Sequence, residues 1–325
     1  MKLPRRTFLH LAAGAGALPA VSRIGWAQTY PTRPVRLIVG FPPGSTSDIV
    51  ARLVGQWLSE RLRQPFIVDN RPGASGNIAT EAVAHALPDG YTLLLVGSNH
   101  AINATLYQNL NFHFIRDIAP IGSVMRTPGV MEVNPEVPAK SVPEFITYAK
   151  ANAGMVNMAS GGNGTVTHLA GELFKIMAGV DIVHVPYRGS PAALTGLLGG
   201  QVQVMFDNVP TSLEFIRLGR LRPLAMTTAT QLAALPNIPP LGQFLSGYEA
   251  SLWQGIGAPK NTSPEIVSML NKEINLALTD PETTAKLAGL GGTPLGGSPV
   301  DFGTLIVEDA EKWGKVIKLT GIKAE

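Results

Sequence analysis

The chain has 325 residues, of which 45% are hydrophobic and 15% are charged, a composition that excludes a disordered protein. It contains no cysteine, so disulfide bonds, thiolate metal sites and cysteine nucleophiles are excluded. The formal net charge of +3 comes from residues 1–27, which carry four of the 26 basic residues and no acidic one, leaving 22 basic against 23 acidic residues. A chain so balanced lacks the basic surface that nucleic acid requires, and we expect no nucleic-acid partner.

The N-terminus has the pattern of an export signal. Arg5 and Arg6 precede an apolar run over residues 9–21, which is too short to span a bilayer. The arginine pair resembles a twin-arginine signal, but Pro4 stands where that signal usually has Ser or Thr, so Sec export stays open. We expect cleavage after Ala27 and a mature protein in the periplasm; an uncleaved N-terminal anchor is the alternative.

Strand and helix patterns alternate from residue 34 onward. Continuous apolar runs predict buried strands, and apolar residues spaced three or four apart predict helices. In the first part of the chain these patterns give strands at 34–41, 65–70 and 91–98 and helices at 47–62 and 77–87. The first of these helices places Ile49, Leu53, Trp57 and Leu62 near one face.

The alternation restarts after residues 117–137. The later patterns give strands at 155–160, 182–187, 202–208, 221–228 and 252–260, and helices at 141–152, 166–179, 190–200, 211–219, 263–278, 280–291 and 300–321. Ser141 is the expected N-cap of the first of these helices, and Gly179 is expected to end the second. In that second helix we expect four residues to face inward: Leu169, Leu173, Ile176 and Met177.

This order predicts an α/β protein with two lobes, each a mostly parallel sheet flanked by helices. Lobe 1 would comprise residues 28–129 and 247–325, and lobe 2 residues 130–246. The chain would cross between the lobes near Val130 and near Ser251. The C-terminal helices have too few strands for a sheet of their own, so we expect them to cover the first lobe.

Ligands of open α/β sheets bind beyond the carboxyl ends of the strands. The residues there are rich in Gly, Ser, Thr and Asn, and several precede helices whose first N–H groups attract anions. The strand-end candidates, in a cleft between the lobes, are Phe41, Pro43, Gly44, Ser45, Thr46, Asp48, Ser98, Asn99, Ser160, Gly162, Asn163, Gly164, Thr165, His168, Tyr187, Arg188, Gly189 and Asp207. Any single turn could be an ordinary capped turn, whereas four or five turns facing one cleft favour the binding of a carboxylate.

Several candidates have alternative roles. Arg188 suits bidentate recognition of a carboxylate, but it could also be a surface residue or pair with an acid on the other lobe. Asp207 could accept a hydrogen bond from a ligand or cap the next helix. His168 could contact a ligand or serve as a packed or capping histidine. Phe41 and Tyr187 could form cleft walls or belong to the core.

Motifs of enzymes are missing. The sequence has no G-x-S-x-G elbow, no phosphate-binding G-x-x-x-x-G-K-[ST] loop and no H-E-x-x-H. His168 and Glu172 lie one helical turn apart, but no third metal ligand is evident. A hydrolase or lyase using His168 or Asp207 is the least favoured alternative, and we expect no catalytic residue and no metal.

Long stretches of the chain resemble one family in the same order. They include FPPGSTSDIVARLV, VDNRPGASGNIA, ASGGNGTVTHLAGELF and VHVPYRGSPAALTGLLGGQVQVMFDN. These segments are similar to the Bug family, the periplasmic solute-binding proteins of tripartite tricarboxylate transporters. The resemblance covers essentially all of the chain after the export signal. Where the family often has a second glycine this chain has Ser45, and where it often has Asp this chain has Gly196.

The resemblance implies a Venus-flytrap fold that binds one small carboxylate without a cofactor. Its ligand loops would be 41–48, 160–167 and 187–190, together with Asp207, and its partners the membrane permease subunits of the transporter. A sensor that presents the carboxylate to a signalling receptor is the alternative, and the sequence does not separate the two. We expect a monomer.

Overall fold

The computed structural model describes residues 30–229, 232 and 234–323, so the expected signal peptide lies outside the described part. The strands are β1 (Val35–Val39), β2 (Phe66–Asn70), β3 (Thr92–Gly97), β4 (Ile118–Val133), β5 (Asn157–Ser160), β6 (Val183–Pro186), β7 (Val204–Asn208), β8 (Arg222–Met226), β9 (Ser251–Pro259) and β10 (Thr293–Pro294). The α-helices are α2 (Thr46–Leu62), α3 (Asn77–Ala84), α4 (Ser98–Leu106), α5 (Phe114–Asp117), α6 (Val142–Ala151), α7 (Val166–Ala178), α8 (Ser190–Leu198), α9 (Val209–Arg217), α10 (Pro264–Ala277), α11 (Pro281–Gly289) and α12 (Pro299–Thr320). Short 3₁₀ turns cover Ala74–Gly76 and Leu241–Gln243.

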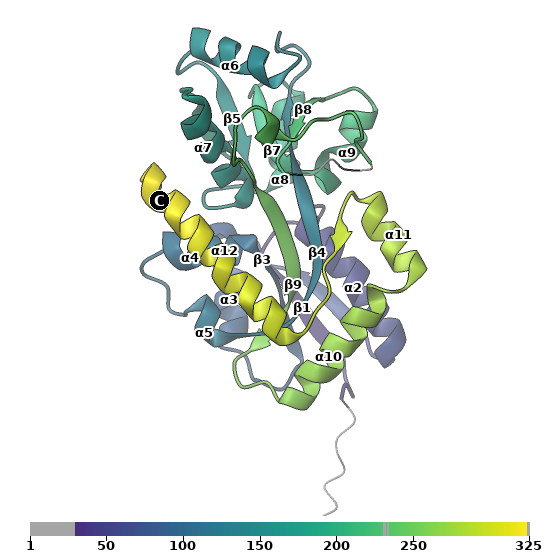
Figure 1. Ribbon diagram of the computed structural model, residues 1–325. Coiled ribbons are helices and arrows are strands. Elements are labelled where there is room, and N and C mark those ends of the chain that lie inside the picture. The colour runs from purple at the N-terminus through teal and green to yellow at the C-terminus, as the bar shows by residue number, and fades with distance from the viewer. Residues whose placement is uncertain (1–29, 230–231, 233, 324–325) are drawn as a thin grey trace, which may run out of the picture. The chain divides into compact units, whose positions relative to one another are not determined.

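The strands form one sheet with the order β2-β1-β3-β9-β4-β7-β5-β6, and β8 and β10 also pair with β4 (Figure 1). β1 is parallel to β2 and β3, and β5 is parallel to β6 and β7. β4 and β9 are antiparallel to all the strands they pair with among the described residues. The α/β class is therefore confirmed, and the sheet is mixed because these two strands run through its centre.

β4 is the long strand that the sequence pattern missed, and the two-residue β10 was missed as well. The 16 residues of β4 include Pro120 and Pro128, which lack a backbone N–H, and the pairing of this strand with β9 shifts register near Gly122 and Ser123. Prolines and glycines of this kind disguise a strand in the sequence. β4 pairs with β9 as far as Pro128 and with β7 from Gly129, so one continuous strand belongs to both halves of the sheet.

The antiparallel centre fixes where the loops lie. Because β3 and β7 run in opposite directions relative to each other, the carboxyl ends of β1 and β3 point toward the second half of the sheet, and those of β5, β6 and β7 point toward the first. The helices that follow these strands, α2, α4, α7, α8 and α9, therefore begin near one another. This arrangement positions the candidate site.

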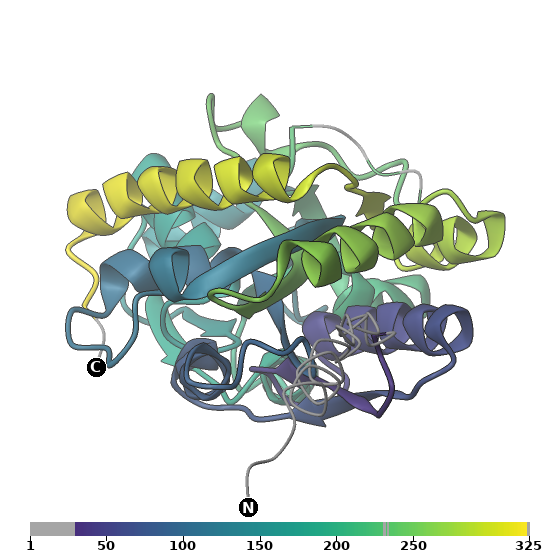
Figure 2. The ribbon, with the colours of Figure 1, turned by 90° about the horizontal axis from the view of Figure 1, so that it is seen from below.

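α12 packs against both halves of the sheet, whereas the sequence analysis expected the C-terminal helices to cover the first lobe. Phe302 and Ile306 share a core cluster with Trp253, but Trp313 and Ile317 belong to the cluster around Phe174 in the second half. A helix of 22 residues is about 33 Å long and can contact both. Figures 1 and 2 show α12 and α10 along the sheet, and both pack against β4.

Several local predictions are confirmed, and others need correction. Ser141 caps α6 by accepting from Glu144 N–H, and Gly179 ends α7 with a left-handed backbone. In α7, however, Ile176 is 52% exposed while Phe174 is fully buried. In α2 the more deeply buried residues are Val50, Ala51, Val54 and Leu58, one position away from the half-buried face that the pattern indicated. Within the described residues, no helix combines the length and apolarity needed to cross a bilayer.

Candidate ligand-binding site

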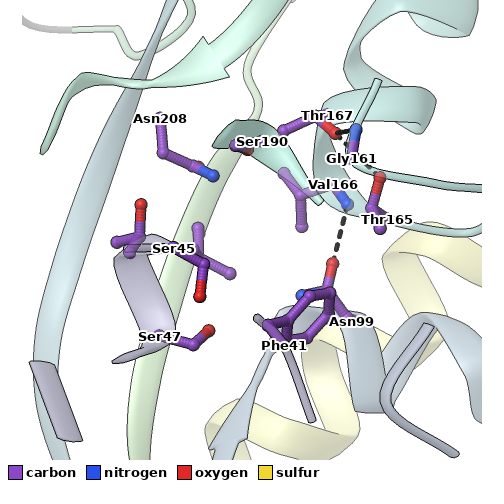
Figure 3. A pocket seen from close by; sticks show the side chains of 12 residues that line it. Phe41, Ser45, Ser47, Asn99, Gly161, Thr165, Val166, Thr167, Ser190 and Asn208 are labelled. Atoms are coloured by element: carbon purple, nitrogen blue, oxygen red, sulfur yellow. Dashed lines mark hydrogen bonds between the residues drawn. The ribbon is translucent and has the colours of Figure 1, made fainter. Parts of the chain in front are cut away.

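Five helix N-termini meet at one small cavity, which we call the inner cavity. α2, α4, α7, α8 and α9 each contribute residues of their N-cap or first turn. The inner cavity is lined by Phe41, Ser45, Thr46, Ser47, Asn99, Gly161, Thr165, Val166, Thr167, Ser190, Asn208 and Leu252, and Figure 3 shows these residues around it. Its volume is about 30 Å³, and none of these lining residues is charged.

The chemistry of this lining favours an anion. The first N–H groups of a helix have no partner within it, and the helix dipole adds partial positive charge at the same end. The hydroxyl of Thr46 is buried and has no hydrogen-bond partner among the described residues. A group with oxygen acceptors would satisfy such donors, and because the lining carries no cation, backbone and hydroxyl groups would have to do the binding.

The hydroxyl N-caps of α2 and α7 both line the cavity. The Ser45 hydroxyl accepts from Asp48 N–H at 3.3 Å, and the Thr165 hydroxyl accepts from His168 N–H at the same distance. Thr167 Oγ1 accepts from Gly161 N–H at 2.9 Å and lies 2.8 Å from Thr165 Oγ1. These bonds hold the hydroxyls in place at the cavity wall.

Asn99 joins helices from the two halves of the sheet. Its side-chain oxygen accepts from Val166 N–H, the first amide of α7, at 2.8 Å (Figure 3). A second contact of this kind is the Ser75 hydroxyl, which donates to the carbonyl of Asn163. Asn99 thus places an amide oxygen at the N-terminus of α7, where a carboxylate oxygen would also be favoured.

The loop before α7 needs glycine at 164. Its φ is +73°, and an added Cβ would clash with the Leu106 side chain and lie 3.1 Å from Asn103 Oδ1. A residue with a side chain would therefore be strained both by its backbone and by the approach of α4. Gly164 N–H donates to His168 Nδ1 at 3.2 Å, so His168 lies behind the loop rather than in the cavity lining.

His168 forms a stack with His184, their ring centroids 3.8 Å apart and their planes 12° apart. His184 Nε2 lies 2.6 Å from the hydroxyl of Ser160, which also accepts from Gly162 N–H. Burial, with the charge of Lys175 and the neighbouring ring, lowers the pKa of His168 to about 3, and burial lowers the pKa of His184 to about 4. Both rings are neutral at pH 7, and the 3.8 Å from His168 Nε2 to Glu172 is too long for a hydrogen bond.

Asp48 also lies outside the cavity lining. Its carboxylate accepts from Gly44 N–H and Asn70 Nδ2, each at 3.0 Å, and pairs with Arg52 at 2.9 Å. Burial raises the pKa of Asp48, but the bonds from Arg52, Gly44 and Asn70 outweigh it and leave the pKa below 3.8. The carboxylate therefore stabilises the loop before α2 from behind.

Asp207 is buried beneath the start of α8. Its carboxylate accepts from the hydroxyls of Ser190 at 2.7 Å, Thr211 at 2.6 Å and Ser212 at 3.0 Å. The Ser212 hydroxyl also lies 2.6 Å from a carboxyl oxygen of Glu132. One hydroxyl hydrogen cannot serve both acids, so the pair is satisfied when Glu132 carries a proton. Burial, and then the charge of Asp207, raises the pKa of Glu132 well above 4.5.

A wider pocket adjoins the inner cavity and shares Phe41 and Gly161 with it. We call it the outer pocket; its volume is about 710 Å³. Tyr107 and Tyr187 belong to its lining, and Arg188 is the one charged residue among those that line it in the described structure.

The structure thus divides the sequence-predicted residues into three groups. Phe41, Ser45, Thr46, Asn99 and Thr165 line the inner cavity, and Gly162, Asn163, Tyr187, Arg188 and Gly189 line the outer pocket with Phe41. Pro43, Gly44, Asp48, Ser98, Ser160, Gly164, His168 and Asp207 line neither. Ser98, for example, accepts from Trp253 N–H and so ties α4 to β9.

Other lining residues were not among the individual candidates. Ser47, Thr167 and Ser190 lie within the loops 41–48, 160–167 and 187–190 that the family resemblance implied. Asn208 directly follows Asp207 at the end of a predicted strand. Leu252 lies inside β9, and no sequence signal distinguishes it from a core residue. Within the described residues, no three His, Asp or Glu side chains gather in a way that could hold a metal ion.

Comparison with known proteins identifies the family. Residues 50–322 match the family model described as the tripartite tricarboxylate transporter family receptor. The chain belongs to this family. It is 37% identical over 316 residues to Protein BugT of Bordetella pertussis, covering 96% of this chain and 95% of BugT.

Solved structures agree with this assignment. Rpa4515 of R. palustris, solved with adipate, is 38% identical with a TM-score of 0.88, covering 90% of this chain and 99% of Rpa4515. MatC of Rhodopseudomonas palustris, solved with bound malate, is 28% identical with a TM-score of 0.84, covering 89% of this chain and all of MatC. The family and these structures are of solute-binding proteins and not of enzymes, in agreement with the missing catalytic motifs.

Proposed function

We propose that the protein captures a small carboxylate in the periplasm and delivers it to the membrane subunits of a tripartite tricarboxylate transporter. The observation that carries this proposal is the convergence of five helix N-termini on a cavity without charged residues. Such a lining binds an anion through N–H and hydroxyl groups. The adipate and malate bound by two related structures support a carboxylate in particular, and the family description supports the transporter.

In this proposal residues 28–129 with 247–325 form one lobe, and residues 130–246 form the other. The carboxylate binds between them and draws them together. A ligand favours a closed state only by the contacts that it gains on closure. The hydroxyls of Ser45 and Thr165, one from each lobe, are suited to supply such contacts. Asn99 and Val166 would add a direct contact between the closed lobes.

Thermal unfolding of the chain from Gln28 onward, with a panel of mono-, di- and tricarboxylates, tests the proposal. A ligand at 100 times its dissociation constant stabilises by about 2.7 kcal/mol, which raises the midpoint by several degrees. We expect one class of carboxylate to do so. If none does, an extract of the denatured protein is examined by mass spectrometry for a co-purified acid. The absence of both a shift and a bound acid would contradict the proposal.

Hydroxyl variants locate the binding site. Ser45→Ala and Thr165→Val should each weaken carboxylate binding by about 1–3 kcal/mol, or about 5- to 150-fold. In the first variant a buried ligand oxygen loses its donor. In the second it loses a hydroxyl that would turn to it from the Gly162 carbonyl, to which Thr165 donates at 2.7 Å. Ser141→Ala is the matched control, since it removes an N-cap hydroxyl from α6, outside both pockets. Its stability should fall by about 1 kcal/mol, as for Ser45→Ala, with unchanged affinity. Equal affinity in all variants would remove these hydroxyls from the site.

A further inference from the structure

The outer pocket offers room that the inner cavity lacks. The inner cavity, at about 30 Å³, has space for about two water molecules and can hold little more than one acid group. The outer pocket, at about 710 Å³, begins at the shared residues Phe41 and Gly161. An acid with a longer chain would therefore extend from the first into the second.

The size of the outer pocket depends on a glycine that does not line it. Gly196 lies within α8, and Tyr187, which lines the pocket, packs against it. A Cβ at position 196 would collide with the Tyr187 hydroxyl and lie 2.8 Å from Cζ and 3.2 Å from Cε1. The ring can lie back on α8 only because residue 196 has no side chain. A larger residue there would push the ring away from α8, toward the pocket.

A single arginine gives the outer pocket its charge. Arg188 is exposed and is the single charged residue of the lining. No hydrogen bond or ion pair of its guanidinium is found among the described residues. Its fork of donors is thus available to an anionic group, and it matches the geometry of a carboxylate.

We propose that the outer pocket is a subsite for the far end of an extended acid, in which Gly196 sets the room through Tyr187 and Arg188 selects a second negative charge. The preferred ligand class is a straight-chain acid with carboxylates at both ends. This proposal rests on the proposed function, because the first carboxylate is held in the inner cavity.

Gly196→Ala tests the role of the glycine. Alanine is favoured over glycine in a helix, so the variant should fold. Against succinate, glutarate, adipate and suberate, we expect it to lose affinity for the longer acids by about 5- to 150-fold and to bind the shortest unchanged. This range corresponds to the free-energy cost that overpacking typically has in a protein core. Gly289→Ala is the matched control, since an added Cβ in α11 meets no atom within 4 Å.

A double variant links the effect to Tyr187. In the Tyr187→Ala background the ring is gone, so Gly196→Ala should change affinity by less than about twofold. A loss for the longer acids that persists without the ring would overturn the role given to Gly196. So would a loss that is equal for short and long acids.

Arg188→Gln tests the second charge, with each diacid compared to its own monoamide. The wild-type protein should bind the diacid about tenfold or more tightly than the monoamide, and the variant should bind the two about equally. Arg220→Gln removes the same charge from an exposed position outside the pocket and should keep the preference. Acids that bind without any preference for the diacid would overturn this inference alone, whereas failure of every carboxylate to bind would overturn the proposed function.

Discussion

The loops at the N-termini of α2 and α7 have equivalent places at the inner cavity but are held by different side chains. Both helices line the inner cavity, and both begin with a hydroxyl N-cap, Ser45 or Thr165. The loop before α2 is held by the carboxylate of Asp48 with Arg52 and Asn70. The loop before α7 is held by a neutral histidine, since Gly164 N–H donates to His168.

This difference shows how the proposed anion site is supported without a charge that would repel an anion. A carboxylate close to the cavity would oppose a negative ligand, and Asp48 is turned away from the lining and compensated by Arg52. His168 accepts an N–H without carrying charge. α4 repeats this solution, because Gly97 N–H donates to His100 Nδ1 at 3.0 Å and burial lowers the pKa of His100 to about 4.

Lowering the pH should have the largest effect on stability, and it should act through the histidines behind the loop before α7. The folded-state pKa values of His168 and His184, about 3 and about 4, lie below the unfolded value of about 6.5. Their contribution to stability is therefore complete above pH 6.5 and is lost as pH falls toward these values. Between pH 7 and pH 5 the pair should cost at most about 4 kcal/mol, near 1.4 kcal/mol per pH unit for each ring. Urea unfolding at both pH values measures the total loss, to which the buried His100 also contributes, and the difference between wild type and histidine variants isolates the share of the pair.

The variants His168→Asn and His184→Gln keep an uncharged acceptor and should each reduce the loss between pH 7 and pH 5. His85→Asn, which replaces an exposed histidine, should not. Asp48 should contribute nothing in this range, because its lowered pKa places its loss of stability below pH 3.8. An identical fall in stability for the wild type and the two buried-histidine variants would contradict the neutral-histidine support.

Asp48→Ala should have the next largest effect. It removes the acceptor of Gly44 N–H, Asn70 and Arg52 together, and hydrogen bonds to a charged group typically contribute about 1.5–3 kcal/mol. We expect a loss of about 2–3 kcal/mol at pH 7 by urea unfolding. The control is Asp69→Ala, which removes a partner of Arg71 at a half-exposed site and should cost less than about 1 kcal/mol. Equal losses would mean that the loop does not depend on Asp48.

Much of the fold could be predicted from the sequence, because apolar runs and helix caps are local signals. The strand ends also pointed to the loops that line the two pockets. β4 could not be predicted, since Pro120 and Pro128 conceal it and its partners are distant in sequence. α4 was missed because Ser98, Asn99 and His100 look like a continuation of a strand end, although they form a first helical turn.

Which residue of a loop faces the cavity was harder to predict than the loop itself. Ser47 and Asp48 are neighbours in the first turn of α2, yet successive helical residues point about 100° apart, and only Ser47 lines the cavity. Asp48 instead bonds back to Gly44 N–H. His168 is turned away in the same manner by Gly164 N–H. These directions follow from three-dimensional partners that the sequence pattern does not contain.

The smallest expected effect concerns Arg52. Its side chain is 56% exposed, whereas that of Asp48 is only 5% exposed. Exposed ion pairs contribute less than about 1 kcal/mol, so Arg52→Ala should cost far less than Asp48→Ala. At about 1 M salt, where the Debye length is near 3 Å, even this difference between wild type and Arg52→Ala should largely disappear. If Arg52→Ala instead lowers stability as much as Asp48→Ala does, and the loss shrinks in salt, the ion pair itself supports the loop. If the loss for Arg52→Ala stays small, the hydrogen bonds from Gly44 and Asn70 to Asp48 support the loop. The loops before α2 and α7 are then held in the same way, because in each an acceptor behind the loop fixes a glycine N–H.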